Sequence, residues 1–140
     1  MEHLKFDFRV YVVVASLDPL EIYISKEGLA RFCTEPYEFP TNKNLHKAYM
    51  HLTNYSLNKY SETYVHTETD DDGSKRTMSS VFKKLADLGY DVDKMWADVK
   101  KMVVKTCIAM AGELKVEMRA VLPPHRAGPS CFQVSSFGSL

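Results

Sequence analysis

The sequence predicts an α+β fold. Three observations support this prediction: an alternating run near the N-terminus, two further β-rich runs set off by turn signals, and two stretches of helical periodicity in the second half. The chain has 140 residues, of which 45% are hydrophobic and 26% charged, as is typical of a globular domain and not of a disordered chain. We therefore expect one domain or part of one.

The first predicted strand covers Phe6 to Ala15. Successive side chains of a strand point to opposite faces, so one face is wholly apolar and consists of Phe6, Phe8, Val10, Val12 and Val14. The other face carries Asp7, Arg9 and Tyr11. Because Val13 continues that second face, we expect it to be covered as well.

Two more strands are expected after a turn at Asp18-Pro19. Leu20 to Ile24 is the second β-rich run, and residues 25–28 lead into a third run from Leu29 to Cys33. These runs predict an antiparallel unit of three strands. Pro36 and Pro40 then indicate a loop, residues 44–60 keep no sustained period, and residues 63–73 read as an exposed acidic loop.

Two helices are expected in the second half. Ser79 or Ser80 can cap a short helix with Val81, Leu85 and Leu88 on one side, and Gly89 lies where a C-terminal cap is expected. A longer helix follows Asp91. Its predicted apolar stripe is Val92, Trp96, Val99, Val103, Thr106, Met110 and Leu114, and Lys94, Lys101 and Lys105 lie opposite. Pro123 to Pro129 interrupt the chain before a short apolar start at Cys131 to Val134.

Composition excludes several classes of protein. Lys plus Arg and Asp plus Glu number 18 each, so no nucleic-acid partner is expected. No apolar run is long enough for membrane insertion, and the first residues are too charged for a signal peptide. Three cysteines without paired spacing favour a reducing, cytoplasmic setting over a zinc site, and no metal ligands are assigned.

Several polar residues allow two interpretations. Asp7, Arg9 and Tyr11 fit either a solvated strand face or, if Val13 indicates that this face is covered, charged groups that need partners such as a nucleotide phosphate with its metal. Arg31 fits a structural ion pair or carboxylate binding equally well. The run His51 to Ser56 fits either a turn that satisfies its own backbone or a binding loop. Residues 73–76 favour a solvated charge cluster. There is no P-loop or Rossmann glycine pattern.

Four strings occur in order: KFDFRVYV at residues 5–12, SLDPLEIY at 16–23, EGLARF at 27–32 and HLTNYS at 51–56. Together they resemble the tubulin tyrosine ligase-like family over residues 5 to 134. GSKR at 73–76 and the two helices resemble its polyglutamylase branch. FCTEPY at 32–37 and NLHK at 44–47 are most similar to the branch member that elongates polyglutamate side chains.

This resemblance implies part of an ATP-grasp fold and an ATP-dependent ligase. The family phosphorylates a glutamate side chain of the tubulin C-terminal tail, and free glutamate attacks the acylphosphate to form an isopeptide bond. Such chemistry requires preorganised cations around the transferred phosphoryl group. A cytoplasmic protein of the microtubule cytoskeleton is implied, with the basal body of a cilium as a further location.

The resemblance also assigns roles. ATP binding is implied for Lys5, Phe6, Asp7, Thr53 and Asn54, and Arg9 is expected to act catalytically on the terminal phosphate. Glutamate binding is implied for Arg31, Tyr55, Ser56 and Lys75.

The end of the chain departs from the family pattern. After a domain at residues 1–134, the tail at 135–140 diverges where the family continues into an Asp-bearing segment and a Glu-x-Asn motif that bind magnesium. The metal ligands are therefore expected beyond this chain. The alternative is a catalytically inactive truncated product that only binds nucleotide, tubulin or a partner.

Overall fold

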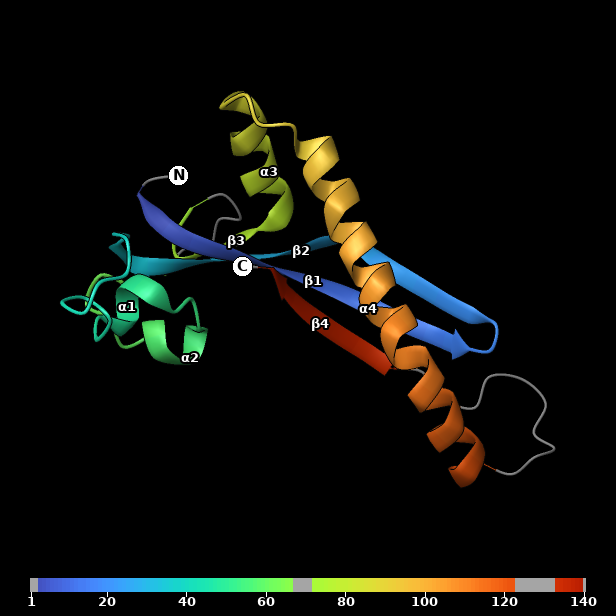
Figure 1. Ribbon diagram of the computed structural model, residues 1–140. Helices are drawn as coiled ribbons and strands as arrows, with labels where there is room; N and C mark the ends of the chain where they lie inside the picture. The colour runs from blue at the N-terminus through green and yellow to red at the C-terminus, as the bar shows by residue number, and fades with distance from the viewer. Residues whose placement is uncertain (1–2, 67–71, 123–132, 140) are drawn as a thin grey trace. The chain divides into compact units, whose positions relative to one another are not determined.

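The computed structural model describes residues 3–66, 72–122 and 133–139. Its elements are β1 (Leu4–Leu17), β2 (Leu20–Pro36), α1 (Ala48–His51), α2 (Tyr55–Asn58), β3 (Lys75–Thr77), α3 (Met78–Asp87), α4 (Val92–Val121) and β4 (Gln133–Ser139). The strands form one sheet in the order β3-β2-β1-β4 (Figure 1). The α+β prediction is confirmed, and the first strand lies between two neighbours. Residues 67–71 of the expected acidic loop, the interruption at residues 123–129, and Cys131 lie outside the described residues.

The second and third predicted strands are one continuous strand, β2. The prediction of a break at residues 25–28 is wrong because Gly28 does not form a turn there. A Cβ atom at Gly28 would lie 2.4 Å from the main-chain oxygen of Arg9 on β1. Glycine in a strand often marks such a close backbone approach. The predicted turn between Leu17 and Leu20 is present, and a connection this short makes β1 and β2 antiparallel.

The chain divides into two compact units, and β1 and β2 contribute to both. Unit 1 comprises Met1–Arg9, Glu27–Tyr90 and Gly138–Leu140, and unit 2 comprises Val10–Lys26 and Asp91–Phe137. In unit 1, β3 pairs antiparallel with β2, with Arg31 opposite Lys75. Apolar side chains of β1, β2 and α3 form its core: Phe8, Ala30, Phe32, Met78, Val81 and Leu85 are buried. The rings of Phe8 and Phe82 lie 4.9 Å apart.

The start of α3 differs from the prediction by a few residues. Thr77 is the N-terminal cap, and its side chain accepts a hydrogen bond from the Ser80 N–H. Ser80 is therefore inside the helix and is itself buried. The predicted C-terminal cap is confirmed, since Gly89 has φ +87°. The Gly89 N–H donates to Ala86 and the Tyr90 N–H to Leu85, the pattern of a Schellman motif.

In unit 2, α4 buries a stripe that differs from the predicted one toward its C-terminal end. Val103, Cys107 and Ala111 are buried, whereas Met110 is 44% and Leu114 45% exposed. Steps of four residues follow a ridge that is inclined to the helix axis, so the buried stripe turns away from the predicted line. Lys94, Lys101 and Lys105 are exposed as expected. Among the described helices, none is long and apolar enough to cross a membrane.

Candidate functional site

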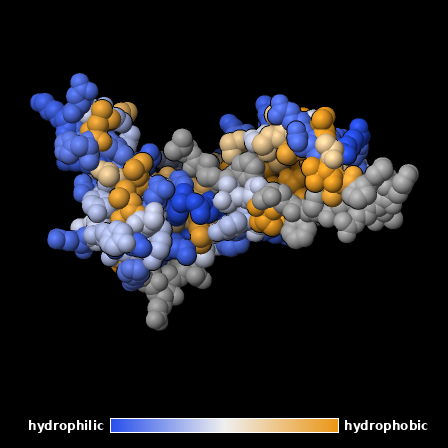
Figure 2. All heavy atoms as spheres, turned by 90° about the horizontal axis from the view of Figure 1, so that it is seen from below, coloured by the Kyte–Doolittle hydropathy of each residue, from blue (hydrophilic) through white to orange (hydrophobic). Residues whose placement is uncertain are grey.

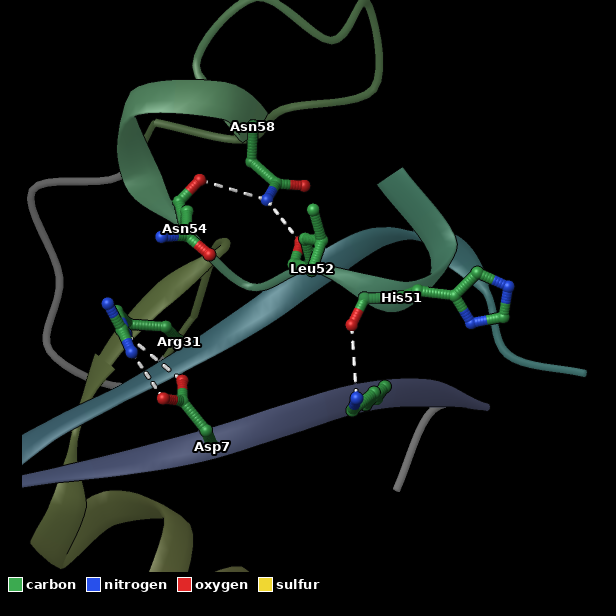
Figure 3. A network of polar contacts seen from close by, with 7 residues as sticks. Asp7, Arg31, His51, Leu52, Asn54 and Asn58 are labelled. Carbon is green, nitrogen blue, oxygen red and sulfur yellow. Dashed lines mark hydrogen bonds and ion pairs between the residues drawn. The ribbon is translucent and has the colours of Figure 1, made fainter. Parts of the chain in front are cut away.

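A largely buried ion pair joins β1 and β2 within unit 1. Asp7 is 7% exposed, and its carboxylate accepts two hydrogen bonds from Arg31 (Figure 3). The Arg31 Nε lies 3.0 Å from Asp7 Oδ1, and Arg31 Nη2 binds Oδ2. A planar guanidinium matches a carboxylate in this two-point manner. Asp7, on the polar face of the first strand, is thus paired with a residue of this chain.

The segment His51 to Ser56 is held by residues outside it. Lys5 Nζ donates to the carbonyl of His51 at 3.0 Å. The side-chain amide of Asn58 donates to the carbonyls of Leu52 at 2.6 Å and Asn54 at 3.0 Å (Figure 3). The segment is therefore not a turn whose side chains satisfy its own backbone.

In this arrangement the His51 ring contacts the Asn44 carbonyl at 3.0 Å through Nε2, and the polar side chains that follow it are uncommitted. Thr53, Asn54, Tyr55 and Ser56 make no side-chain hydrogen bond to the described residues. Thr53 and Tyr55 line a small hollow together with Arg31, Phe32, Asn58, Tyr64, Ser74 and Lys75. The space-filling view shows hydrophilic residues over much of the α1–α2 side, with apolar residues between them (Figure 2). The geometry therefore favours the binding-loop interpretation.

Lys75 and Arg76 have different environments. The Lys75 side chain is exposed and makes no ion pair or hydrogen bond to other described residues. Arg76 is 4% exposed, its guanidinium carbon lies 4.2 Å from the Phe32 ring centroid, and its Nε donates to the Gly73 carbonyl. The prediction of a solvated charge cluster is therefore wrong for Arg76, because its side chain packs on an aromatic ring.

The electrostatics of the hollow follow from these partners. Arg31 is neutralised by Asp7 on one edge of its guanidinium, while its other edge keeps N–H groups that the pair does not use. Lys75 adds a positive charge, and no carboxylate of the described residues forms an ion pair with it. A small carboxylate or phosphate would therefore meet a net positive hollow.

Other predicted site residues lie outside the hollow. Arg9 is on the same strand face as Asp7, two residues further along β1, and is partly exposed. Phe6 stacks on Phe32 at 5.1 Å between ring centroids. The carbonyl of Asn54 accepts from Asn58, and Ser56 is exposed on α2.

Two further features bear on chemistry. Burial raises the pKa of the Cys33 thiol to about 11, with Asp7 adding to this effect and Lys5 opposing it. Cys33 is therefore an unreactive, protonated thiol near neutral pH. Within the described ranges, no three His, Cys, Asp or Glu side chains come together to hold a metal ion.

Sequence reasoning missed Asn58, which is 1% exposed and also accepts a hydrogen bond from Thr34 Oγ1 at 3.1 Å. Its position four residues after Asn54 was the available signal, because side chains and backbone groups at that spacing meet on a helical turn.

The described part of the chain thus combines a sheet, a braced polar segment, and a small hollow lined by Arg31 and Lys75. The family model described as "Tubulin-tyrosine ligase family" matches residues 1–138. The chain therefore belongs to the tubulin-tyrosine ligase family. The match includes most of β4, which extends past the predicted boundary at residue 134.

Similar proteins in this family carry the name tubulin polyglutamylase. The chain is 53% identical over 140 residues to human "Tubulin polyglutamylase TTLL11", covering 100% of this chain and 20% of that protein. Identity to "Tubulin polyglutamylase ttll-11" of Caenorhabditis elegans is 48% over 139 residues, covering 97% and 20%. Identity to zebrafish (Danio rerio) "Tubulin polyglutamylase ttll6" is 43% over 140 residues, covering 100% and 18%. The chain thus spans about a fifth of the length of these relatives.

Proposed function

We propose that the chain is part of an ATP-dependent ligase that adds glutamate to side-chain glutamates of tubulin tails. The proposal extends to this chain the activity that the names of its relatives state. Free glutamate and the tubulin tail are then its ligands, and the cytoplasmic microtubule cytoskeleton, including the cilium basal body, is its location.

One observation carries the proposal. The segment His51 to Ser56 is held by Lys5 and Asn58, and it presents Thr53 and Tyr55 to the same hollow as Arg31 and Lys75. Three separate stretches of the chain thereby converge on one small, positively charged surface.

The hollow suits free glutamate better than ATP. The hollow is partly open and its volume is about 10 Å³, which is roughly the space of one water molecule, so a ligand would lie across its mouth. There Lys75 can contact one carboxylate as a point charge, and the free edge of Arg31 can donate to the same group or to the second carboxylate. The Tyr55 hydroxyl is a further donor or acceptor at the rim.

Some of the predicted ATP-site residues have side chains free to contact ATP, and others are already paired within the chain. Arg9, Thr53 and Asn54 have polar side-chain atoms without described partners and suit a phosphate or ribose. Lys5 and Asp7 are committed to His51 and Arg31, so their proposed part is to hold the site together. ATP would supply the phosphoryl group, and Arg9 would stabilise the charge on it.

Magnesium does not fit the described carboxylates, since Asp7 is neutralised by Arg31 and no three ligand side chains cluster in the described parts. We therefore assign no step to the metal here. The proposal places its ligands outside the described residues.

The test is transfer of radiolabelled glutamate to tubulin with ATP and magnesium, using a polypeptide that contains this chain and has the length of its relatives. We expect incorporation that needs ATP, and an Arg9→Ala variant that loses at least about a hundredfold in kcat, the scale on which removal of one transition-state donor acts. Lys43→Ala, a charge removal on an exposed residue outside the hollow, should retain activity. Absence of incorporation by the wild type, or full activity of Arg9→Ala, would contradict the proposal.

A further inference from the structure

We propose that Asn58 is a positioning residue that fixes the conformation in which Thr53 and Tyr55 face the hollow. This inference rests on the proposed function for its ligands, but its structural part can be tested without any ligand. Asn58 is the last residue of α2.

The side-chain amide of Asn58 brackets Thr53. Its nitrogen donates to the carbonyl of the residue before Thr53, Leu52, at 2.6 Å, and to the carbonyl of the residue after Thr53, Asn54, at 3.0 Å (Figure 3). Both amide hydrogens are thereby used. The Leu52 carbonyl lies in the Leu52–Thr53 peptide plane and the Asn54 carbonyl in the Asn54–Tyr55 plane. Fixing both carbonyls restricts the backbone just before Thr53 and just before Tyr55, and therefore the directions of these two side chains.

The orientation of the amide is itself determined. Asn58 Oδ1 accepts from Thr34 Oγ1 at 3.1 Å, and the Thr34 carbonyl accepts from Thr63 Oγ1 at 2.9 Å. A flipped amide would place its oxygen against two carbonyl oxygens and lose both donated bonds. The hydroxyl of Thr34 on β2 thus connects the sheet to the binding segment.

The segment needs this support because its own helical structure is short. α1 and α2 have four residues each, and neither has a side-chain cap at its N-terminus. Helices of this length are not stable alone. Asn58 is 1% exposed, so its hydrogen bonds do not compete with water and hold the segment more firmly than exposed bonds would.

The first experiment examines the ligand-free 140-residue chain by NMR. Asn58→Asp keeps the shape of the side chain but replaces both donors with a carboxylate facing two carbonyl oxygens. We expect it to shift the Thr53 methyl and Tyr55 ring resonances. Thr34→Val should shift the same resonances less, and Thr34→Ser, which keeps the hydroxyl, should resemble the wild type.

The matched control is Leu85→Ala on α3, a buried residue of the same unit that does not line the hollow. It should lower the thermal unfolding midpoint without moving the Thr53 and Tyr55 resonances. If Asn58→Asp does not fold, the comparison of Thr34→Val with Thr34→Ser decides the same question. Unchanged resonances in Thr34→Val, or equal shifts in Leu85→Ala, would overturn the inference.

The second experiment measures steady-state kinetics of glutamate transfer in a polypeptide of the relatives' length. Asn58→Asp should raise the KM for ATP and for glutamate about tenfold, corresponding to about 1.4 kcal/mol of lost binding, with a smaller change in kcat. Leu85→Ala should leave both KM values unchanged. Equal KM values in wild type and Asn58→Asp would overturn the positioning role. An inactive wild type would contradict the proposed function, while the NMR comparison would still decide the role of Asn58.

Discussion

Asp7→Asn tests whether the ion pair with Arg31 is a buried, two-point contact. The substitution keeps the size of the side chain and one acceptor oxygen, and it removes the charge and one of the two hydrogen bonds. Removing one partner of a fully buried pair costs about 3 to 5 kcal/mol. Because the Arg31 side chain is 15% exposed, water can replace part of the lost contact, and we expect a loss of about 1.5 to 3 kcal/mol, the value of one charged hydrogen bond.

The assay is urea unfolding of the 140-residue chain, read as a shift of the midpoint at constant slope. Asp18→Asn is the matched control, since Asp18 carries exposed ion pairs with Lys115 at 3.4 Å and Arg119 at 3.3 Å. Exposed pairs contribute about 0 to 1 kcal/mol. Equal destabilisation by the two substitutions would refute the account of the buried pair.

Three further predictions concern the fold. Gly28→Ala should destabilise the fold by about 1 to 3 kcal/mol, because its Cβ would lie 2.4 Å from a main-chain oxygen. Gly112 is a helical position with open space around it, so Gly112→Ala should instead stabilise the fold by up to about 1 kcal/mol. Urea unfolding distinguishes the two outcomes. Val103→Ala should cost more unfolding free energy than Met110→Ala, since these residues are 0% and 44% exposed; a larger loss for Met110→Ala would contradict the observed stripe. Cys33 should react with a thiol reagent at pH 8 at least about a hundredfold more slowly in the folded chain than in urea. The reason is that the thiolate is the reacting form and burial raises the pKa of Cys33 from 9.0 to about 11. Equal rates would contradict the burial of this thiol.

The sequence predicted the features that depend on local patterns. Alternation over Phe6 to Ala15 identified β1, and the positive-φ glycine at Gly89 marked the end of α3. These predictions succeed because the alternation of side chains in a strand and the capping of a helix end both depend on only a few neighbouring residues. Gly28 was misread because a turn and a close approach to a neighbouring strand both need a residue without a side chain, and only the partner strand distinguishes them.

The site was predicted in part. The motif resemblance named Arg31, Thr53, Tyr55 and Lys75, and the structure brings these four residues to one hollow. Their assigned roles in ligand binding stay predictions. A structural ion pair was one of the two interpretations of Arg31, and the structure supplies its partner, Asp7. The hydrogen bonds of Asn58 were not predicted, because strand periodicity does not specify which residues meet across strands and turns.

The face of α4 that is buried was also predicted only in part. The observed line through Cys107 and Ala111 lies one residue C-terminal to the predicted line through Thr106 and Met110. A helix can present either line, and the angle at which it crosses its neighbours selects one of them. That angle is a property of the packed unit and not of the helix sequence.

The most direct test of the central claim is the KM for free glutamate in a Lys75→Ala variant of a polypeptide with the length of the relatives. Lys75 is exposed, lines the hollow and has no described partner, so its removal should not disturb the fold. We predict that the KM for glutamate rises about tenfold or more, as expected for loss of one charged contact. The KM for ATP should change little, and Lys43→Ala should match the wild type. A KM for glutamate that is the same in Lys75→Ala, Lys43→Ala and the wild type would contradict the assignment of this hollow as the glutamate site.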